Sequence, residues 1–341
     1  MIALLAPSTA PNAASVGAAL VNAARMAAVD QGDPLLQLRV YDTAGNAAQA
    51  RLAAEQAIND DAQIILGPLF GANTKAVKSV ASAAGIKVLS FSTDSSVAGD
   101  PVYLTGFLPE IAAARITQFA RARGLGAIGV FYPNNAYGSA ASRGAAAAVG
   151  PNIVASAQYE RTQEGIPTAT QDFAGQAQSA GVQALLIAES GQALRYVGTL
   201  LQTYGVPPEQ VKYLGLGEWN SRSTLQEGAL KGGWFAAPDP AAVKAFVEKY
   251  QAQYGSVPPI QAVLAYDAVR MAGTLLAEGR AQNTAPFTTE SLTRGRGFQG
   301  VVGPIALGRD GLGRRGMAVL EVGEGVFQTI DPVPVSVTAG S

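Results

Sequence analysis

The chain has 341 residues, of which 48% are hydrophobic and 14% are charged, with 24 basic side chains against 25 acidic ones. This length favours two domains, and the apolar content is enough for two buried cores. The nearly balanced charge, without a basic stripe, argues against binding to nucleic acid. No apolar run approaches the ~18 residues that a membrane-spanning helix needs.

The sequence contains neither cysteine nor histidine. Disulfides, zinc sites built on thiolates or imidazoles, and Ser-His-Asp or Cys-His catalytic groups are therefore excluded. The glycine-rich turn 215–218 lacks the third glycine of a dinucleotide-binding fingerprint. The turn 309–313 has too few oxygen ligands for a calcium loop. We therefore predict no cofactor, no metal site and no catalytic residue.

From the N-terminus, predicted strands and helices alternate. Continuous apolar runs predict buried parallel strands, and apolar residues at helical spacing predict helices. The first five predicted strands are 2–6, 36–41, 64–67, 88–90 and 102–105. Helices lie between them, and Asn46 is a good cap for the second helix. This βαβαβαβ ladder has the size of one doubly wound lobe.

The ladder begins again after Pro109, with strands 127–132, 153–159, 184–188, 211–215 and 234–236. Two later helices, 241–254 and 262–278, have no obvious place on this second lobe, so we expect them to return to the first. The closing strands are 303–307, 317–322 and 326–330.

The predicted fold class is α/β, with two doubly wound parallel-sheet lobes joined by a three-crossing hinge over a cleft. The crossings are expected near 106–109, 236–240 and 309–316, which contain glycine or proline. Lobe I is predicted to span 1–107 and 238–310, and lobe II 108–237 and 311–332. Residues 333–341 are predicted to form a flexible tail.

The stretch 63–97 supplies the clearest candidate for a binding edge. A predicted helix begins near Asn73 and Thr74, directly after a Gly-Pro-Leu-Phe-Gly turn, so its free N–H groups could receive an anionic group. The next strand ends in the polar run 90–94 at the same carboxyl edge, where open α/β sheets bind ligands.

The predicted ligand-binding residues all lie in strand-end loops. They are Ser8, Thr9, Phe70, Asn73, Thr74, Ser92, Thr93 and Asp94 in lobe I, and Tyr137, Glu189, Ser190, Glu218 and Trp219 in lobe II.

Each of these residues also has an ordinary alternative role. Ser92, Thr93 and Asp94 suit turns and caps equally well. Tyr137 and Trp219 favour ligand contact more strongly, because aromatic residues between polar loop neighbours have less reason to be core. Glu189 ends a buried strand, so it would contact a ligand or form an interlobe salt bridge.

The order of several motifs resembles a known family. LLAPSTA, IILGPLFG, VLSFSTD, an AYG turn after GVFYP, and LGLGEW before GGWFAAPDP resemble the type I periplasmic binding proteins of the leucine/isoleucine/valine-binding superfamily. More narrowly, FSTDSSVAG with GFLP, GGWFAAPDP and LAYDAV is similar to the penicillin-binding-protein activator branch. The similarity covers nearly the whole chain.

The resemblance implies two lobes, three hinge crossings and no enzymatic activity. It also implies export to the periplasm, with a signal or lipoprotein segment before Met1. Ser92 matches a residue that holds a ligand carboxylate, Tyr137 matches a second-lobe contact, and Glu218 matches the ammonium-binding acid if a one-residue slip is allowed.

The chain also departs from the family pattern. Gly71 and Asp94 stand where serine and threonine are usual, and Ser190 stands where an aromatic contact is common. A carboxylate at position 94 would repel a ligand carboxylate by several kcal/mol. A standard amino acid in the usual pose is therefore not expected.

Three functions follow from the sequence. The first is a penicillin-binding-protein activator that regulates peptidoglycan synthesis, whose interlobe cleft holds a small polar ligand or none. The second is a receptor that delivers an amino acid or related molecule to an ABC permease. The third is a hydrolase in which Asp94, Glu189 and Glu218 converge, although nothing distinguishes an acid from a nucleophile among them.

Overall fold

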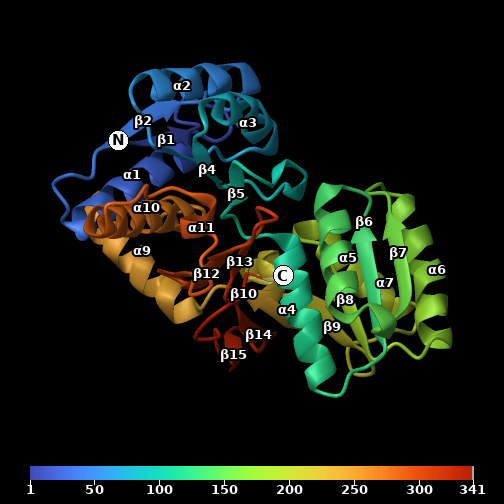
Figure 1. The fold of residues 1–341 in the computed structure, drawn as a ribbon. Coiled ribbons are helices and arrows are strands. Elements are labelled where there is room, and N and C mark those ends of the chain that lie inside the picture. The colour runs from blue at the N-terminus through green and yellow to red at the C-terminus, as the bar shows by residue number, and fades with distance from the viewer. Residues whose placement is uncertain (340–341) are drawn as a thin grey trace. The chain divides into compact units, whose positions relative to one another are not determined.

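The computed structural model describes residues 1–339, which form two compact units (Figure 1). The first unit comprises Met1–Leu108, Pro240–Gly316 and the segment from Pro334 onward, and the second comprises Pro109–Asp239 and Met317–Val333. Both are α/β units in which helices flank a parallel sheet, as the sequence predicts.

The boundaries predicted at 107/108, 237/238 and 332/333 lie within two residues of this division, whereas the one predicted at 310/311 falls at 316/317. Residues 311–316 belong to the first unit, because the strand Gly313–Arg315 pairs there with Gly303–Leu307. The predicted tail also differs, since 334–339 lie with the first unit, where Val335 and Val337 line a pocket. Residues 340–341 lie outside the described part of the chain.

The first unit is built on a five-stranded parallel sheet of order β2-β1-β3-β4-β5. Its strands are β1 (Ile2–Ala6), β2 (Leu38–Asp42), β3 (Ile64–Leu66), β4 (Lys87–Ser90) and β5 (Val102–Leu104). A second, antiparallel sheet contains β11 (Phe298–Gly300), β12 (Gly303–Leu307) and β13 (Gly313–Arg315).

The helices of the first unit form two layers on the parallel sheet. They are α1 (Ala14–Gln31), α2 (Ala47–Asn59), α3 (Gly71–Ala84), α9 (Pro240–Tyr254), α10 (Ala262–Gln282) and α11 (Thr289–Leu292), with a short 3₁₀ turn η1 (Ser95–Val97). Helices α2 and α3 pack beside each other, and α1 packs against α10 (Figure 1). The core shared by α1, α9, α10 and β1 shows that the late helices return to the first unit, as the sequence predicts.

A buried ion pair joins three parts of the first unit. Arg315 in β13 donates to Asp267 in α10 at 2.7 Å, and its side chain is 3% exposed. The same guanidinium donates to the carbonyl of Thr105 at 2.8 Å, while Asp267 accepts from the backbone of Val301 at 2.7 Å. These bonds compensate the cost of burying both charges.

The second unit contains a seven-stranded sheet of order β15-β14-β10-β9-β8-β6-β7. The strands are β6 (Ile128–Pro133), β7 (Ile153–Tyr159), β8 (Ala184–Ile187), β9 (Lys212–Gly215), β10 (Trp234–Ala237), β14 (Ala318–Val322) and β15 (Phe327–Asp331). The first five are mutually parallel, and β14 and β15 are antiparallel additions.

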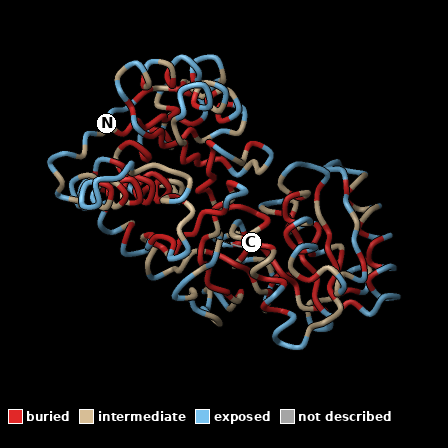
Figure 2. Tube along the Cα trace, in the orientation of Figure 1, coloured by how far each residue is buried: buried red, intermediate tan, exposed pale blue. Residues whose placement is uncertain are grey.

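The helices of the second unit also lie in pairs: α4 packs against α5, and α6 against α7. The helical elements are α4 (Pro109–Ala122), α5 (Ala136–Val149), α6 (Gly165–Ser179), α7 (Gly191–Thr203) and α8 (Arg222–Leu225), with turns η2 (Gly150–Asn152), η3 (Gly217–Trp219) and η4 (Gly228–Leu230). Figure 2 shows the central strands of each unit as buried and many helix surfaces as exposed. Within residues 1–339, no helix is both long enough and apolar enough to cross a bilayer.

Candidate functional site

The strand-end loops of the first unit lie at one edge, because all five strands of its main sheet are parallel. The turn after β3 depends on Gly67, whose φ is 82°. A Cβ atom there would lie 2.3 Å from the carbonyl oxygen of Leu5, so only glycine fits. The turn leads into α3, whose N-cap residue Phe70 supplies no side-chain bond.

Two predicted hydroxyl groups of this unit, those of Thr74 and Ser92, are already bonded to neighbouring groups of the chain. The Thr74 and Ser90 hydroxyls are 2.8 Å apart, and Thr74 also donates to the carbonyl of Phe70 at 3.0 Å. The Ser92 backbone donates to Ser90 Oγ at 3.2 Å, and Ser92 Oγ accepts from the Asp94 backbone at 3.0 Å. Thr74 and Ser92 are buried. The Thr74 hydroxyl links α3 to the end of β4, and the Ser92 hydroxyl bonds within the loop after β4.

Asp94 lies against the first residue of α3. A Cβ atom at Gly71 would lie 2.7 Å from Asp94 Oδ2, so the absence of a side chain at Gly71 makes room for the carboxylate. The other oxygen, Oδ1, accepts from the backbone of Ser96 at 3.0 Å and thereby caps η1. The chain thus places its own negative charge beside the helix N-terminus that the sequence predicted for an anionic ligand group.

The other predicted residues of this unit differ in accessibility. Thr9 is exposed, but its hydroxyl donates to Asp42. Burial raises the pKa of Asp42, whereas hydrogen bonds from Thr9 and the Ala44 backbone lower it, and the net direction is down. Ser8 is half-buried, Thr93 is exposed and Phe70 is 37% exposed. Asn73 is buried, and its Nδ2 has no hydrogen-bond partner.

The second unit brings Tyr137 and Glu218 together from different strand ends. Asn135, which follows β6, caps α5 by accepting from the backbone of Gly138 at 2.8 Å. This places Tyr137 in the first turn of α5, where its hydroxyl donates to the Glu218 carboxylate after β9. Burial, followed by the negative charges of Glu218 and Glu189, raises the pKa of Tyr137 well above its usual value. The phenol therefore keeps its proton and acts as a donor.

Glu189 follows β8 and is only 4% exposed. Its carboxylate accepts from Tyr159 at 2.7 Å and from the backbone of Ser190 at 2.9 Å, and it pairs with Arg161 at 3.2 Å. Its ion-pair partner, Arg161, lies in the second unit itself. The predicted alternative of a salt bridge between the lobes is therefore wrong for Glu189. Ser190 is the half-buried N-cap residue of α7 and makes no side-chain cap.

Two charged or polar partners of Glu189, Tyr159 and Arg161, are not among the predicted residues. Tyr159 is the last residue of β7, which is parallel to β6, and Arg161 follows two residues later. The strand-end argument used for the other residues applies equally to β7, so it would have selected both.

Trp219 does not lie on the surface of its loop. The indole is 0% exposed, and Cβ atoms at Gly215 and Gly233 would lie 2.1 and 2.8 Å from its ring atoms. These glycines form a slot in which the ring packs near Phe235. The expectation that Trp219 lies outside the core is therefore wrong, while its neighbour Glu218 is exposed.

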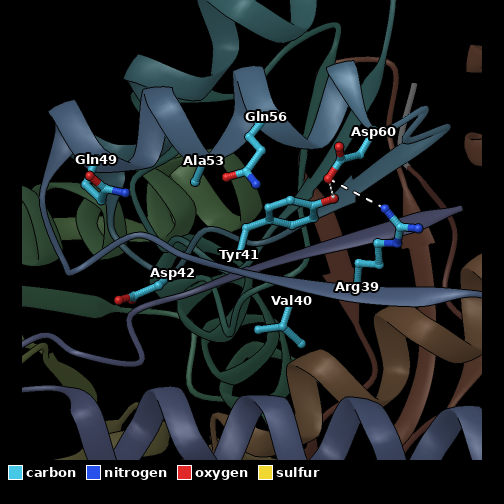
Figure 3. A pocket seen from close by; sticks show the side chains of 8 residues that line it. All are labelled: Arg39, Val40, Tyr41, Asp42, Gln49, Ala53, Gln56 and Asp60. Carbon is cyan, nitrogen blue, oxygen red and sulfur yellow. Dashed lines mark hydrogen bonds and ion pairs between the residues drawn. The ribbon is translucent and has the colours of Figure 1, made fainter.

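A pocket of about 480 Å³ lies elsewhere on the first unit, between β2 and α2 (Figure 3). Its lining residues are Arg39, Val40, Tyr41, Asp42, Gln49, Ala53, Gln56 and Asp60. Another, of about 350 Å³, is lined by Arg270, Arg294 and Arg296 among others. None of the predicted ligand-binding residues lines either pocket. Across residues 1–339, no group of three or more acidic, histidine or cysteine residues could hold a metal ion.

The family described as periplasmic binding protein matches residues 1–326, and the chain belongs to this family. The resemblance to its leucine/isoleucine/valine-binding type is thereby confirmed. No curated protein matches the chain.

Solved structures share the fold over nearly their whole length. A putative branched-chain amino acid ABC transporter protein from Rhodospirillum rubrum is 19% identical, with a TM-score of 0.82 and coverage of 97% of this chain and 99% of that one. A solute-binding protein from Rhodopseudomonas palustris, in complex with 3,4-dihydroxybenzoic acid, is 17% identical, with a TM-score of 0.66 and coverage of 98% and 97%. LivJ from Streptococcus pneumoniae, in complex with isoleucine, is 17% identical, with a TM-score of 0.62 and coverage of 97% and 99%.

Proposed function

We propose that this protein is the periplasmic solute-binding component of an ABC importer, and that it binds an amino acid or a related small polar molecule without transforming it. The observation that carries this proposal is the Tyr137–Glu218 pair at the carboxyl ends of parallel strands. The pair presents an exposed carboxylate whose orientation is set by a half-buried phenol donor. Strand-end loops are the usual ligand-binding positions of open α/β sheets.

In this proposal, Glu218 binds a positively charged ligand group. A carboxylate can accept several hydrogen bonds, so one bond from Tyr137 leaves acceptor capacity for an ammonium. Glu189 is less suited to this task, because Tyr159, Arg161 and the Ser190 backbone already bind it. Tyr137 then acts as a positioning residue that keeps Glu218 in one orientation.

Two relatives show the range of ligands that this fold accepts. One was solved with isoleucine and the other with 3,4-dihydroxybenzoic acid, which has no amino group. For this chain, the exposed carboxylate of Glu218 favours a ligand with an amino group over a purely acidic one.

Thermal unfolding of the intact protein with a panel of amino acids, amines and aromatic acids tests the proposal. A ligand at 100 times its Kd adds about 2.7 kcal/mol of stability, which raises Tm by several degrees. We expect Glu218→Gln to reduce the shift strongly and Tyr137→Phe to reduce it less. Glu164→Gln, a change at an exposed glutamate of the same unit, is the matched control. No shift with any compound, or equal shifts in all variants, would refute the proposal.

A second candidate function is a penicillin-binding-protein activator that regulates peptidoglycan synthesis. The Gly71–Asp94 packing favours it, because Asp94 occupies the space beside the α3 N-terminus in the first unit. Such a protein would act through contact with a penicillin-binding protein rather than through a solute. Saturable binding to an immobilised penicillin-binding protein, with no thermal shift from the panel, would support this second function. A solute response with no such binding would exclude it.

A further inference from the structure

Strand β2 forms an open edge of the first unit's main sheet. Among residues 1–339 it pairs only with β1. The Ile2 N–H donates to the carbonyl of Gln37 at 2.7 Å, and the Thr43 N–H donates to the carbonyl of Ala6 at 3.0 Å. Alternate residues of a parallel strand face the same neighbour, so the odd-numbered residues of this segment bond to β1. Leu38, Val40 and Asp42 consequently direct their N–H and C=O groups away from the sheet.

The open edge lacks the usual protection against pairing with another strand. It contains no proline, and its register with β1 shows no bulge. Exposed apolar side chains lie around it: Leu35 just before the strand is 67% exposed, Val40 is 36% exposed and Leu52 on α2 is 56% exposed. Natural proteins usually blunt such edges with prolines, bulges or lysines.

The two faces of β2 differ in chemistry. Figure 3 shows Arg39 and Tyr41 on the side of α2, close to Asp60, while Val40 points to the opposite side. The Tyr41 hydroxyl donates to Asp60 at 2.8 Å, and the Arg39 guanidinium lies 3.6 Å from the same carboxylate. The pocket of about 480 Å³ beside these groups leaves room for further side chains.

We propose that β2 pairs in antiparallel fashion with β2 of a second copy of this chain, about a two-fold axis at Val40. In this register Val40 faces the partner's Val40, and Leu38 faces the partner's Asp42. The outward backbone groups of both strands then exchange hydrogen bonds. The two five-stranded sheets become one continuous sheet.

The pair formed by Arg39 and the partner's Tyr41 is complementary in this register, and it favours a second copy of the chain over an unrelated strand. Arg39 falls opposite the partner's Tyr41, which itself binds the partner's Asp60. The guanidinium therefore meets an aromatic ring and a carboxylate of opposite charge, and directly opposed pairs of this kind are favourable. By symmetry, the same contact forms twice.

Sedimentation equilibrium of the intact chain over a concentration series tests the proposal. We expect a concentration-dependent dimer with twice the chain mass. Val40→Lys and Val40→Asp each place like charges opposite one another at the axis, so each variant alone weakens the dimer at least about tenfold. An equimolar mixture of the two variants places lysine opposite aspartate and restores the dimer.

Val40→Thr is the matched control, since it keeps a β-branched side chain and adds no charge, and it should dimerise like the parent. Val40 is partly exposed and its backbone faces outward, so the charged variants should unfold at the same urea midpoint as the parent. A monomer at all concentrations overturns the proposal. A dimer that survives both charged variants, or a mixture that stays monomeric, overturns it equally.

Discussion

The strand-end loops of the two units use similar polar residues in different ways. In the first unit, the Ser90 hydroxyl bonds to the Thr74 hydroxyl and accepts from the Ser92 N–H. The Ser92 hydroxyl accepts from the Asp94 N–H, and Asp94 caps η1. In the second unit, Glu189 is satisfied internally, but Glu218 has a phenol donor on one side and is exposed. A polar cluster at a strand edge can therefore serve only to hold loops together. We propose ligand recognition for the second unit because Glu218 keeps an exposed charge there.

The largest expected change in stability is at Trp219, whereas its neighbour Glu218 should tolerate substitution. Trp219→Ala removes a fully buried indole and should destabilise the protein by about 4 kcal/mol. Urea unfolding followed by circular dichroism measures this loss. Glu218→Gln is the control and should change stability by less than about 1 kcal/mol. A Trp219→Ala protein of parental stability would contradict the placement of the indole in the core.

Glu189→Ala tests whether the hydrogen bonds of the buried Glu189 carboxylate stabilise the second unit. The change leaves the Tyr159 hydroxyl and the Ser190 N–H without their acceptor, so we expect a loss of about 2 to 3 kcal/mol. Arg161 is half exposed, and water can solvate it after the change. Arg161→Ala should therefore cost clearly less than Glu189→Ala, and the reverse order in urea unfolding would argue against this account.

Gly71→Ala tests the close contact between α3 and the loop that carries Asp94 in the first unit. The added Cβ would collide with the Asp94 carboxylate, so we expect a loss of about 1 to 2 kcal/mol. The same change in an Asp94→Gly background should cost much less, because that background removes both the carboxylate and the Asp94 Cβ atom, which would lie 2.8 Å from the added Cβ. This double-mutant cycle isolates the contact. Additive effects of the two substitutions would show that Gly71 is required for another reason.

The smallest expected change in stability at neutral pH comes from the raised pKa of Tyr137. Burial and the charges of Glu218 and Glu189 raise its pKa in the folded state. Above about pH 10 the unfolded tyrosine loses its proton while the folded one keeps it. The free energy of unfolding contributed by this group is therefore fully present below that pH and falls as pH rises. Unfolding at a series of alkaline pH values should show a shallower decline for Tyr137→Phe than for the parent, and identical slopes would contradict the shift.

Much of the fold follows from local patterns in the sequence. The apolar runs 2–6 and 64–67 predict strands that the structure contains, with ends shifted by a residue at most. Because α9 and α10 had no place on the second lobe, the sequence predicts that they pack on the first unit, and their residues lie in its core. Strand-end placement also found Tyr137 and Glu218, because parallel strands bring their carboxyl ends to one edge.

The missed features depend on contacts between segments distant in the sequence. The slot for Trp219 requires Gly215 at the end of β9 and Gly233 just before the neighbouring strand β10, and polar neighbours in the sequence gave no sign of it. The fit between Gly71 and Asp94 likewise joins two loops that follow different strands. In both cases the informative residue is a glycine, whose function is the space that it leaves for another side chain.

The most direct test of the central claim is isothermal titration calorimetry of the intact protein with the panel compound that raises Tm most, in parallel on the parent, Glu218→Gln and Glu164→Gln. We predict one solute per chain for the parent and for Glu164→Gln, and an affinity at least about tenfold lower for Glu218→Gln. Unchanged affinity in Glu218→Gln would contradict the assignment of recognition to the Tyr137–Glu218 pair.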